Sequence, residues 1–211
     1  MQTLLSTGEH ALLALLGLAS FASLAIFIER FVYLRAATFD GRRELDRLNE
    51  QANAGTLDAY ASEAEYRLGA AGKAVAAGIR SSHLGKAGVR ETIDSARAFL
   101  RLDLERRVAV LGTVGSNAPF VGLLGTVLGI IQAFRDLAAA IHSGSAQPGA
   151  VMAGISTALV ATAVGLIVAI PAVIFNNICR RRIARIEREL DGLAHAVIAH
   201  APDHPAPKKG G

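Results

Sequence analysis

The chain has 211 residues, of which 52% are hydrophobic and only 19% are charged. This balance is unusual for a soluble domain of that size and indicates a membrane protein. The net charge of +4 requires no nucleic-acid partner, because positive residues gathered beside an anionic lipid leaflet account for it. A single cysteine, Cys179, excludes an intrachain disulfide.

The first uncharged interval runs from Ala11 to Ile28 and follows ten residues that carry little information. A helix needs about 20 apolar residues to cross the ~30 Å hydrocarbon layer, so a first transmembrane span is predicted within residues 1–34. No Lys or Arg precedes this interval and no small-residue cleavage site follows it, so we expect no removable signal peptide. Its Leu-rich and aromatic surface is suited to lipid contact.

Residues 35–107 are polar, rich in Ala and punctuated by glycines, which predicts a small cytoplasmic helical domain. From Val89 to Leu111, apolar residues recur every three or four positions, the period of one helix face. No Pro or pair of Gly interrupts this stripe before the membrane. We therefore predict one continuous helix from about residue 86 to residue 141, on the order of 80 Å long at 1.5 Å per residue.

Two further intervals without Asp, Glu, Lys or Arg run from Val108 to Phe134 and from Leu137 to Ile178. The first predicts a second span over residues 108–141. The second of these intervals, from Leu137 to Ile178, contains a polar, Gly-containing stretch, which we interpret as a short periplasmic loop over residues 142–150. The rest of it predicts a third span over residues 151–178.

Beyond the third span we predict a cytoplasmic helical extension over residues 179–200 and a disordered tail over residues 201–211. Three histidines, His195, His200 and His204, resemble a metal-binding group by composition. Because they lie in or beside the flexible tail, we predict no metal site.

The distribution of positive charge predicts the topology. Of the 22 Lys and Arg residues, none precedes the first span and only Arg135 lies between the second and third spans. Positive residues concentrate on the cytoplasmic side of a membrane, so we expect the N-terminus outside and the C-terminus inside. Arg30, next to Glu29, closes the first span at the cytoplasmic interface.

The second and third spans each carry a stripe of small residues at helical spacing. The stripes are Gly115, Pro119, Gly122, Thr126, Gly129 and Ala133, and Gly154, Ala158, Thr162, Gly165 and Ala169. Small side chains permit close approach of helices in lipid. The pattern alone leaves two interpretations open: a plain packing contact, or a cavity lined by the hydroxyls of Thr126 and Thr162.

The segments NAPFVGLLGTVLGIIQAF (residues 117–134) and GISTALVATAVGLIVAIPAVIFNN (residues 154–177) resemble the two signature segments of the MotA/TolQ/ExbB proton-channel family. With the Glu29–Arg30 pair, the likeness covers most of the chain except the tail. Three spans and a short outer loop are similar to the TolQ/ExbB branch rather than to the four-span flagellar stators. The resemblance implies an all-α integral membrane protein with three transmembrane helices and long cytoplasmic helical extensions, in a ring of five copies.

The resemblance also implies the partners and the activity. The second and third helices of the ring would surround single-span partner helices of the ExbD/TolR type, whose membrane aspartate takes up protons. A TonB/TolA-like energy transducer and the lipid of the bacterial inner membrane are further partners. The chain would be a stator-like subunit of a motor that couples the flow of protons, or of sodium, to mechanical work on the cell envelope. It would need no cofactor.

The site residues follow from the same resemblance. Thr126 and Thr162 match the family threonines that line the pore, and Thr157 stands where many members have a glutamate. The other signature residues, which we expect to pack the pore helices, are Pro119, Gly122, Gly125, Gly129, Gly154, Ala158, Gly165 and Pro171. The missing glutamate argues against a ring carboxylate at the outer mouth and is compatible with a specialised gliding or surface-motility motor.

Other function classes fit less well. The chain has no GxxxxGK[ST], HExxH or GxSxG motif, so we do not expect an enzyme. A passive membrane scaffold and a self-sufficient channel remain as alternatives. A scaffold would enclose no cavity large enough for foreign helices, whereas such a channel would conduct without a partner.

Overall fold

The computed structural model describes residues 2–142 and 148–205, and within these ranges the chain is helical with short turns and no strand. The elements in chain order are α1 (Gln2–Ala36), α2 (Gly41–Asn53), α3 (Leu57–Leu68), α4 (Ala70–Arg80), the 3-10 turn η1 (Ser82–Leu84), α5 (Gly85–Glu105), α6 (Val108–His142) and α7 (Pro148–His200). The predicted all-α fold class is confirmed.

The chain divides into two compact units, which are described separately. The apolar unit comprises residues 1–29 and 107–178, and the polar unit comprises residues 30–106 and the chain from residue 179 onward. Helices α1 and α7 each contribute to both units.

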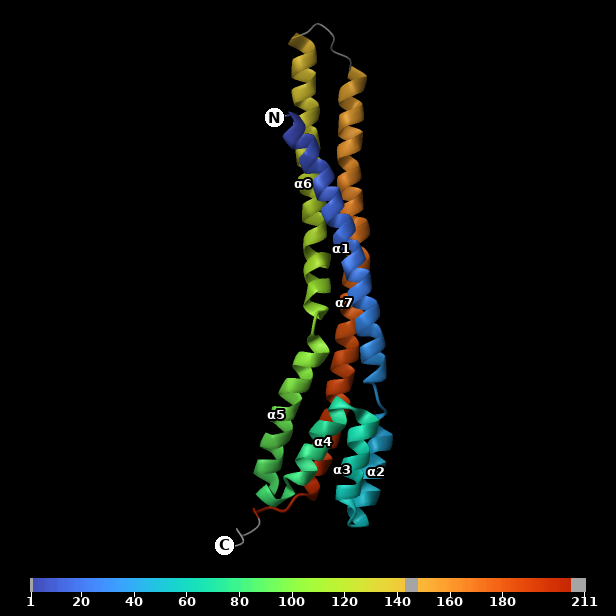
Figure 1. Ribbon diagram of the computed structural model, residues 1–211, viewed down its shortest axis with the longest axis vertical. Helices are drawn as coiled ribbons and strands as arrows, with labels where there is room; N and C mark the ends of the chain where they lie inside the picture. Colours follow the sequence, from blue (N-terminus) through green and yellow to red (C-terminus); the bar gives the residue numbers. More distant parts are fainter. Residues whose placement is uncertain (1, 143–147, 206–211) are drawn as a thin grey trace. The chain divides into compact units, whose positions relative to one another are not determined.

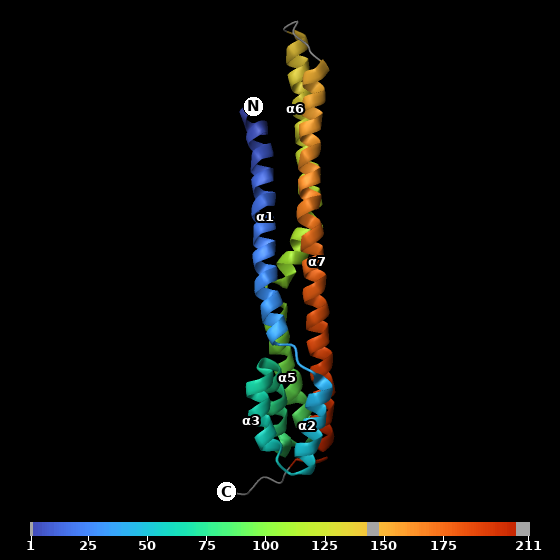
Figure 2. The ribbon, with the colours of Figure 1, turned by 90° about the vertical axis from the view of Figure 1, so that its right-hand side faces the viewer.

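Three of the described helices, α1, α6 and α7, are long and apolar enough to cross a membrane. Within the apolar unit, α6 and α7 run side by side (Figures 1 and 2). Their outer surfaces, like that of α1, carry large exposed apolar side chains such as Phe21, Phe120 and Ile167. Such surfaces suit contact with lipid.

The predicted continuous helix from about residue 86 to residue 141 is wrong, because the chain breaks between α5 and α6 at Arg106 and Arg107. Arg107 has a φ of 62°, in the left-handed region that costs a non-glycine residue about 1–2 kcal/mol. The Arg107 guanidinium also forms an ion pair with Glu29. In the polar unit, a carbonyl in the last turn of α5 accepts a hydrogen bond from Arg30. Apolar periodicity continues on both sides of the break and does not reveal it.

The other predicted boundaries can be compared with the helix ends. Helix α7 continues past residue 178 to His200, and neither Pro119 nor Pro171 ends its helix. At the edges of the predicted loop, His142 and residues 148–150 are helical, whereas residues 143–147 lie outside the described residues.

The first residues of the predicted tail, 201–205, contact the start of α5. Ala201 is buried, and the Pro202 carbonyl accepts a hydrogen bond of 3.0 Å from the Lys86 backbone amide. The Lys86 ammonium also pairs with the Asp203 carboxylate at 2.5 Å. These contacts attach the chain that follows α7 to the start of α5. Residues 206–211 lie outside the described residues.

A buried ion pair joins α2 to α3 in the polar unit. Glu44 is only 6% exposed, and its two carboxylate oxygens accept hydrogen bonds of 2.6 and 2.8 Å from the Arg67 guanidinium. The Tyr60 hydroxyl donates to the Glu44 backbone carbonyl at 3.3 Å. Burial, together with the nearby carboxylate, raises the pKa of Tyr60 far above its ordinary value, so this hydroxyl stays protonated and remains a donor.

We expect Glu44→Ala to lower the free energy of unfolding of the polar unit by about 2 kcal/mol, because the Arg67 guanidinium loses two hydrogen bonds to a buried carboxylate and keeps only its ion pair with the more exposed Glu63. Denaturation of the detergent-solubilised protein, followed by pulse proteolysis, measures this loss. The matched control is Glu65→Ala, since Glu65 makes a similar two-bond pair with Arg80, which is 51% exposed. Solvent-exposed pairs contribute little, so equal losses in the two variants would contradict the role of Glu44.

Candidate functional site

The candidate residues lie where the small-residue stripes of α6 and α7 face each other. A Cβ atom built on Gly122 would lie 2.7 Å from the Ala161 carbonyl oxygen, and one built on Gly165 would lie 2.8 Å from the Ala118 carbonyl oxygen. No side chain fits at such distances. The two glycines therefore let the backbones approach closely, which is how helices associate in lipid.

The same contact continues toward the C-terminal end of α6 and the N-terminal end of α7. A Cβ atom on Gly129 would meet the Ala158 Cβ at 2.6 Å, and one on Gly154 would meet the Ala133 Cβ at 2.8 Å. Successive positions along α6 meet earlier and earlier positions along α7, so the helices pack antiparallel. Gly129, Ala133, Gly154 and Ala158 belong to the two predicted stripes, which the structure brings together.

Helix α1 covers one side of this pair. Leu16 is 2% exposed and packs in a cluster with Ala118, Val168 and Ala169. Gly125 also faces α1, because a Cβ atom built on it would lie 3.9 Å from the Leu12 side chain.

Thr126 and Thr162 meet along this contact, where their hydroxyl groups are hydrogen bonded to each other. The two hydroxyl oxygens lie 3.2 and 3.3 Å from the carbonyl oxygen of Gly122. Thr126 is 8% exposed, whereas Thr162 is half-buried. The structure thus places two of the three predicted pore threonines in one hydrogen-bonded group.

The hydrogens of this group can be counted. Each hydroxyl has one hydrogen to donate, and the pair holds two acceptors, the Gly122 carbonyl and the other hydroxyl. When Thr126 donates to Gly122, Thr162 is left to donate to Thr126 or to an acceptor outside the pair. Because Thr162 is the more exposed of the two, it is the hydroxyl that can donate to a ligand while Thr126 keeps its bond to the Gly122 carbonyl.

The third predicted threonine does not join this group. Thr157 is exposed on α7, and its hydroxyl donates to the carbonyl of Ala153 on its own helix at 3.0 Å. Of the two prolines among the predicted packing residues, Pro119 is half-buried and Pro171 is exposed.

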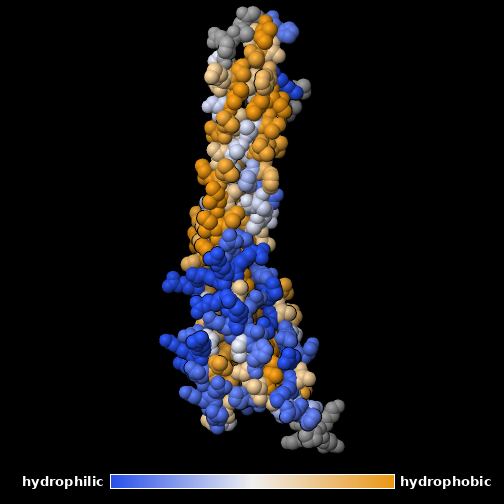
Figure 3. Space-filling model, turned by 180° about the vertical axis from the view of Figure 1, so that it is seen from behind, coloured by the Kyte–Doolittle hydropathy of each residue, from blue (hydrophilic) through white to orange (hydrophobic). Residues whose placement is uncertain are grey.

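A second polar group on α6 was not predicted. Thr113, Ser116 and Asn117 are exposed. Figure 3 shows that the surface of the apolar unit is not uniformly hydrophobic, since pale and light-blue areas lie between its orange areas. The two hydroxyls donate to the carbonyls of Ala109 and Gly112 at 3.1 and 2.9 Å, and the Asn117 amide donates to the Thr113 carbonyl at 2.8 Å. Their spacing of three and four residues is the sequence signal that marks one helix face.

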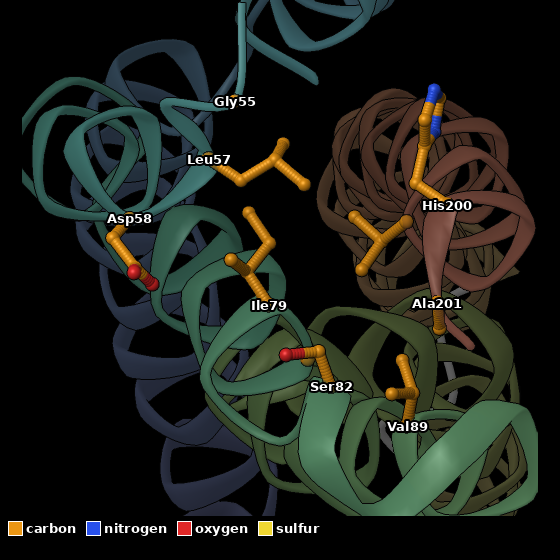
Figure 4. A pocket seen from close by; sticks show the side chains of 10 residues that line it. Gly55, Leu57, Asp58, Ile79, Ser82, Val89, His200 and Ala201 are labelled. Carbon is orange, nitrogen blue, oxygen red and sulfur yellow. The ribbon is translucent and has the colours of Figure 1, made fainter. Parts of the chain in front are cut away.

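The polar unit contains a separate open pocket of about 170 Å³ near the end of α7. Leu57 and Ile79 point into this pocket, while Asp58 and His200 lie on opposite sides of it (Figure 4). Its polar groups therefore do not converge on one point, as a catalytic group would require. Among the residues that the structure describes, no three His, Cys, Asp or Glu side chains gather as metal ligands.

Comparison with known proteins adds to this geometry. Residues 68–192, more than half of the chain, match the MotA/TolQ/ExbB proton channel family. The chain is 41% identical over 101 residues to the biopolymer transport protein ExbB-like 2 of Helicobacter pylori, a match that covers 48% of this chain and 65% of that protein.

Two biopolymer transport proteins named ExbB are also similar. The protein of Aquifex aeolicus is 45% identical over 87 residues, which are 41% of this chain and 57% of the relative. That of Salmonella typhimurium is 41% identical over 106 residues, covering 45% of this chain and 42% of the relative. The chain thus spans less than two thirds of the length of each relative.

We expect Gly122→Val to destabilise the packing of α6 against α7 by about 1–3 kcal/mol, because the new side chain would overlap the Ala161 carbonyl. Thermal unfolding of the purified protein in detergent measures the effect. Gly17→Val on α1 is the matched control, since a Cβ atom there meets nothing within 4 Å. Equal melting temperatures for the two variants would show that the contact does not hold the helices together.

Proposed function

The chain belongs to the MotA/TolQ/ExbB proton channel family, and on this premise we propose that it is the ring-forming, stator-like subunit of an ion-driven motor in the bacterial inner membrane. Five copies surround single-span partner helices of the ExbD/TolR type, whose membrane aspartate carries the proton. The ring couples the proton motive force to mechanical work on the cell envelope through a TonB/TolA-like transducer. The printed names of the relatives, biopolymer transport proteins, support a transport role.

One observation carries this proposal: the contact between the two signature helices holds a pair of hydroxyls and no charged group. Residues 108–134 and 151–178 contain no Asp, Glu, Lys or Arg. Without an ionisable group in these stretches, the contact between the two helices cannot relay protons by its own titration. The acid must therefore come from a partner helix placed against the ring.

A threonine hydroxyl suits both states of such an acid. The ionised aspartate only accepts hydrogen bonds, and Thr162 can donate its hydrogen to it. The protonated aspartate donates an O–H, and the same hydroxyl oxygen can accept it. Thr162 thus stabilises the carboxyl group before and after proton uptake, while Thr126 keeps its bond to Gly122.

The distribution of Lys and Arg supports a periplasmic N-terminus and a cytoplasmic C-terminus, which would place the polar unit in the cytoplasm. Thr157 supplies a neutral hydroxyl where many family members carry a glutamate. In this proposal the change of charge along the ion path comes entirely from the partner.

A passive membrane scaffold is the competing function, and the closed hydrogen-bond group favours it. Thr126 and Thr162 satisfy each other without a ligand, as two packing residues would. The two functions differ in whether a purified complex moves ions across a membrane. A scaffold would also assemble without a partner helix at its centre.

We expect Thr162→Val to lower ion-driven proton flux at least about tenfold, the factor that corresponds to ~1.4 kcal/mol in the barrier, because valine offers the aspartate no hydrogen bond. The isosteric side chain should leave the ring assembled. Proton flux is measured in proteoliposomes that hold the ring with its co-purified single-span partner, and assembly is measured by native mass spectrometry.

The control for this experiment is Thr92→Val on α5, where the hydroxyl donates only to the Gly88 carbonyl of its own helix at 2.8 Å. Its flux should equal that of the unchanged protein. Normal flux in Thr162→Val would remove the proposed role of this hydroxyl. If the complex formed by the protein without substitutions carries no proton flux under an imposed proton gradient, the result would favour the scaffold.

A further inference from the structure

Helix α5 begins without the side-chain cap that helices commonly have at this end. The first four N–H groups of a helix have no partner within it, and a Ser, Thr, Asp or Asn at the N-cap position usually accepts a hydrogen bond from one of them. The N-cap residue of α5 is Leu84, whose side chain has no acceptor. Helix α2 shows the ordinary arrangement, because its N-cap residue Asp40 accepts hydrogen bonds from the Arg42 and Arg43 amides.

The chain that follows α7 supplies the acceptor that Leu84 lacks. Lys86 is the second residue of α5, and its amide is one that an N-cap side chain commonly binds. This amide donates to the Pro202 carbonyl at 3.0 Å. A backbone carbonyl from a distant part of the chain thus takes the place of the N-cap side chain.

Two further contacts hold this segment at the start of α5. Gly85 has a φ of 74°, and a Cβ atom built on it would lie 3.0 Å from both the His204 carbonyl carbon and the Pro205 nitrogen. Glycine therefore lets the backbone of the segment lie directly against the helix. The Asp203 carboxylate pairs with the Lys86 ammonium, and a negative charge beside the first turn of a helix is favourable.

The same segment forms one wall of the pocket in the polar unit. Ala201, the first residue after α7, lines this pocket together with Val89 of α5 (Figure 4). Val89 is completely buried and Ala201 is 7% exposed. Because Ala201 belongs to the segment that Lys86 binds, the pocket keeps this wall only while the segment stays at the start of α5.

We propose that residues 201–205 form a clasp, which caps α5 and shields Val89 when it is closed, and which frees the first turn of α5 when it is released. Its ion pair is weak, since the Asp203 and Lys86 side chains are 75% and 43% exposed, so the clasp opens more easily than the interior of the polar unit. Helix α5 leads to α6 and the clasp follows α7, so it ties together the extensions of both signature helices. The clasp does not depend on the proposed motor function.

Hydrogen exchange of the Lys86 amide tests the cap in the purified full-length chain. Mass spectrometry with electron-transfer fragmentation resolves this amide. We expect Asp203→Lys to raise its exchange rate at least about fivefold, because the substitution replaces an attraction to Lys86 by a repulsion. The matched control is Asp46→Lys, which reverses an exposed charge on α2 and should leave the rate unchanged. A Lys86 amide that exchanges as fast in the unsubstituted protein as in Asp203→Lys would overturn the clasp.

A second pair of variants tests the backbone contact. Gly85→Ala should raise the exchange rate of the Lys86 amide about tenfold or more, because the new methyl group would meet the backbone of His204 and Pro205. Gly69→Ala is its control, since Gly69 also has a positive φ, of 57°, but a Cβ atom there meets nothing within 4 Å. Equal increases in the two variants would assign the effect to backbone strain alone and reject the contact.

The shielding of Val89 is tested with a thiol probe. Buried Cys179 is first replaced by Ala, Val89→Cys is introduced, and its reaction with a charged methanethiosulfonate is timed. Adding Asp203→Lys should speed this reaction about fivefold, in step with the exchange of the Lys86 amide, because a thiol reacts only when it is accessible. Adding Asp46→Lys instead should leave it unchanged. A reaction rate that does not respond to Asp203→Lys would overturn the shielding of the pocket wall by the clasp.

Discussion

The contact between α6 and α7 exists only because no side chain separates the two backbones. At Gly122 and Gly165, carbonyl oxygens and α-carbons of the opposite helix occupy the space that a Cβ atom would need. Lipid gives helices no hydrophobic reason to associate, so van der Waals packing and buried hydrogen bonds must hold them. The meeting of Thr126 with Thr162 depends on this approach, because two short hydroxyl side chains bridge only helices that are very close.

The contact offers a neutral hydroxyl group to the carboxyl group of a partner helix. A hydroxyl can donate to a carboxylate and accept from a carboxylic acid, whereas a fixed charge would favour one state over the other. The absence of ionisable residues from residues 108–134 and 151–178 keeps the contact neutral. In the proposed motor, the protonation of the partner is then the only change of charge, and the ring responds to it.

The polar side chains of α6 differ in burial and in hydrogen-bond partners. Thr126 is buried and bonded across to α7, so it contributes to the pairing of the helices. Ser116 and Asn117 are exposed in the single chain and bonded only within their own helix, so they contribute nothing to that pairing. At the end of the apolar unit, Glu29 pairs with Arg107, which is the one non-glycine residue in the described ranges that has a positive φ.

The sequence by itself determined that the chain is all-α, that three segments can cross a membrane, and that small residues line one face of two of them. These properties depend on local composition and on the helical period, which any stretch of chain displays before it folds. Only the tertiary structure decided that Thr126 pairs with Thr162 while Thr157 stays apart, that the helix breaks at Arg106 and Arg107, and that the chain after His200 packs against α5. The register between helices and the contacts of the chain after His200 join positions far apart in the sequence, and no local pattern encodes which of them meet.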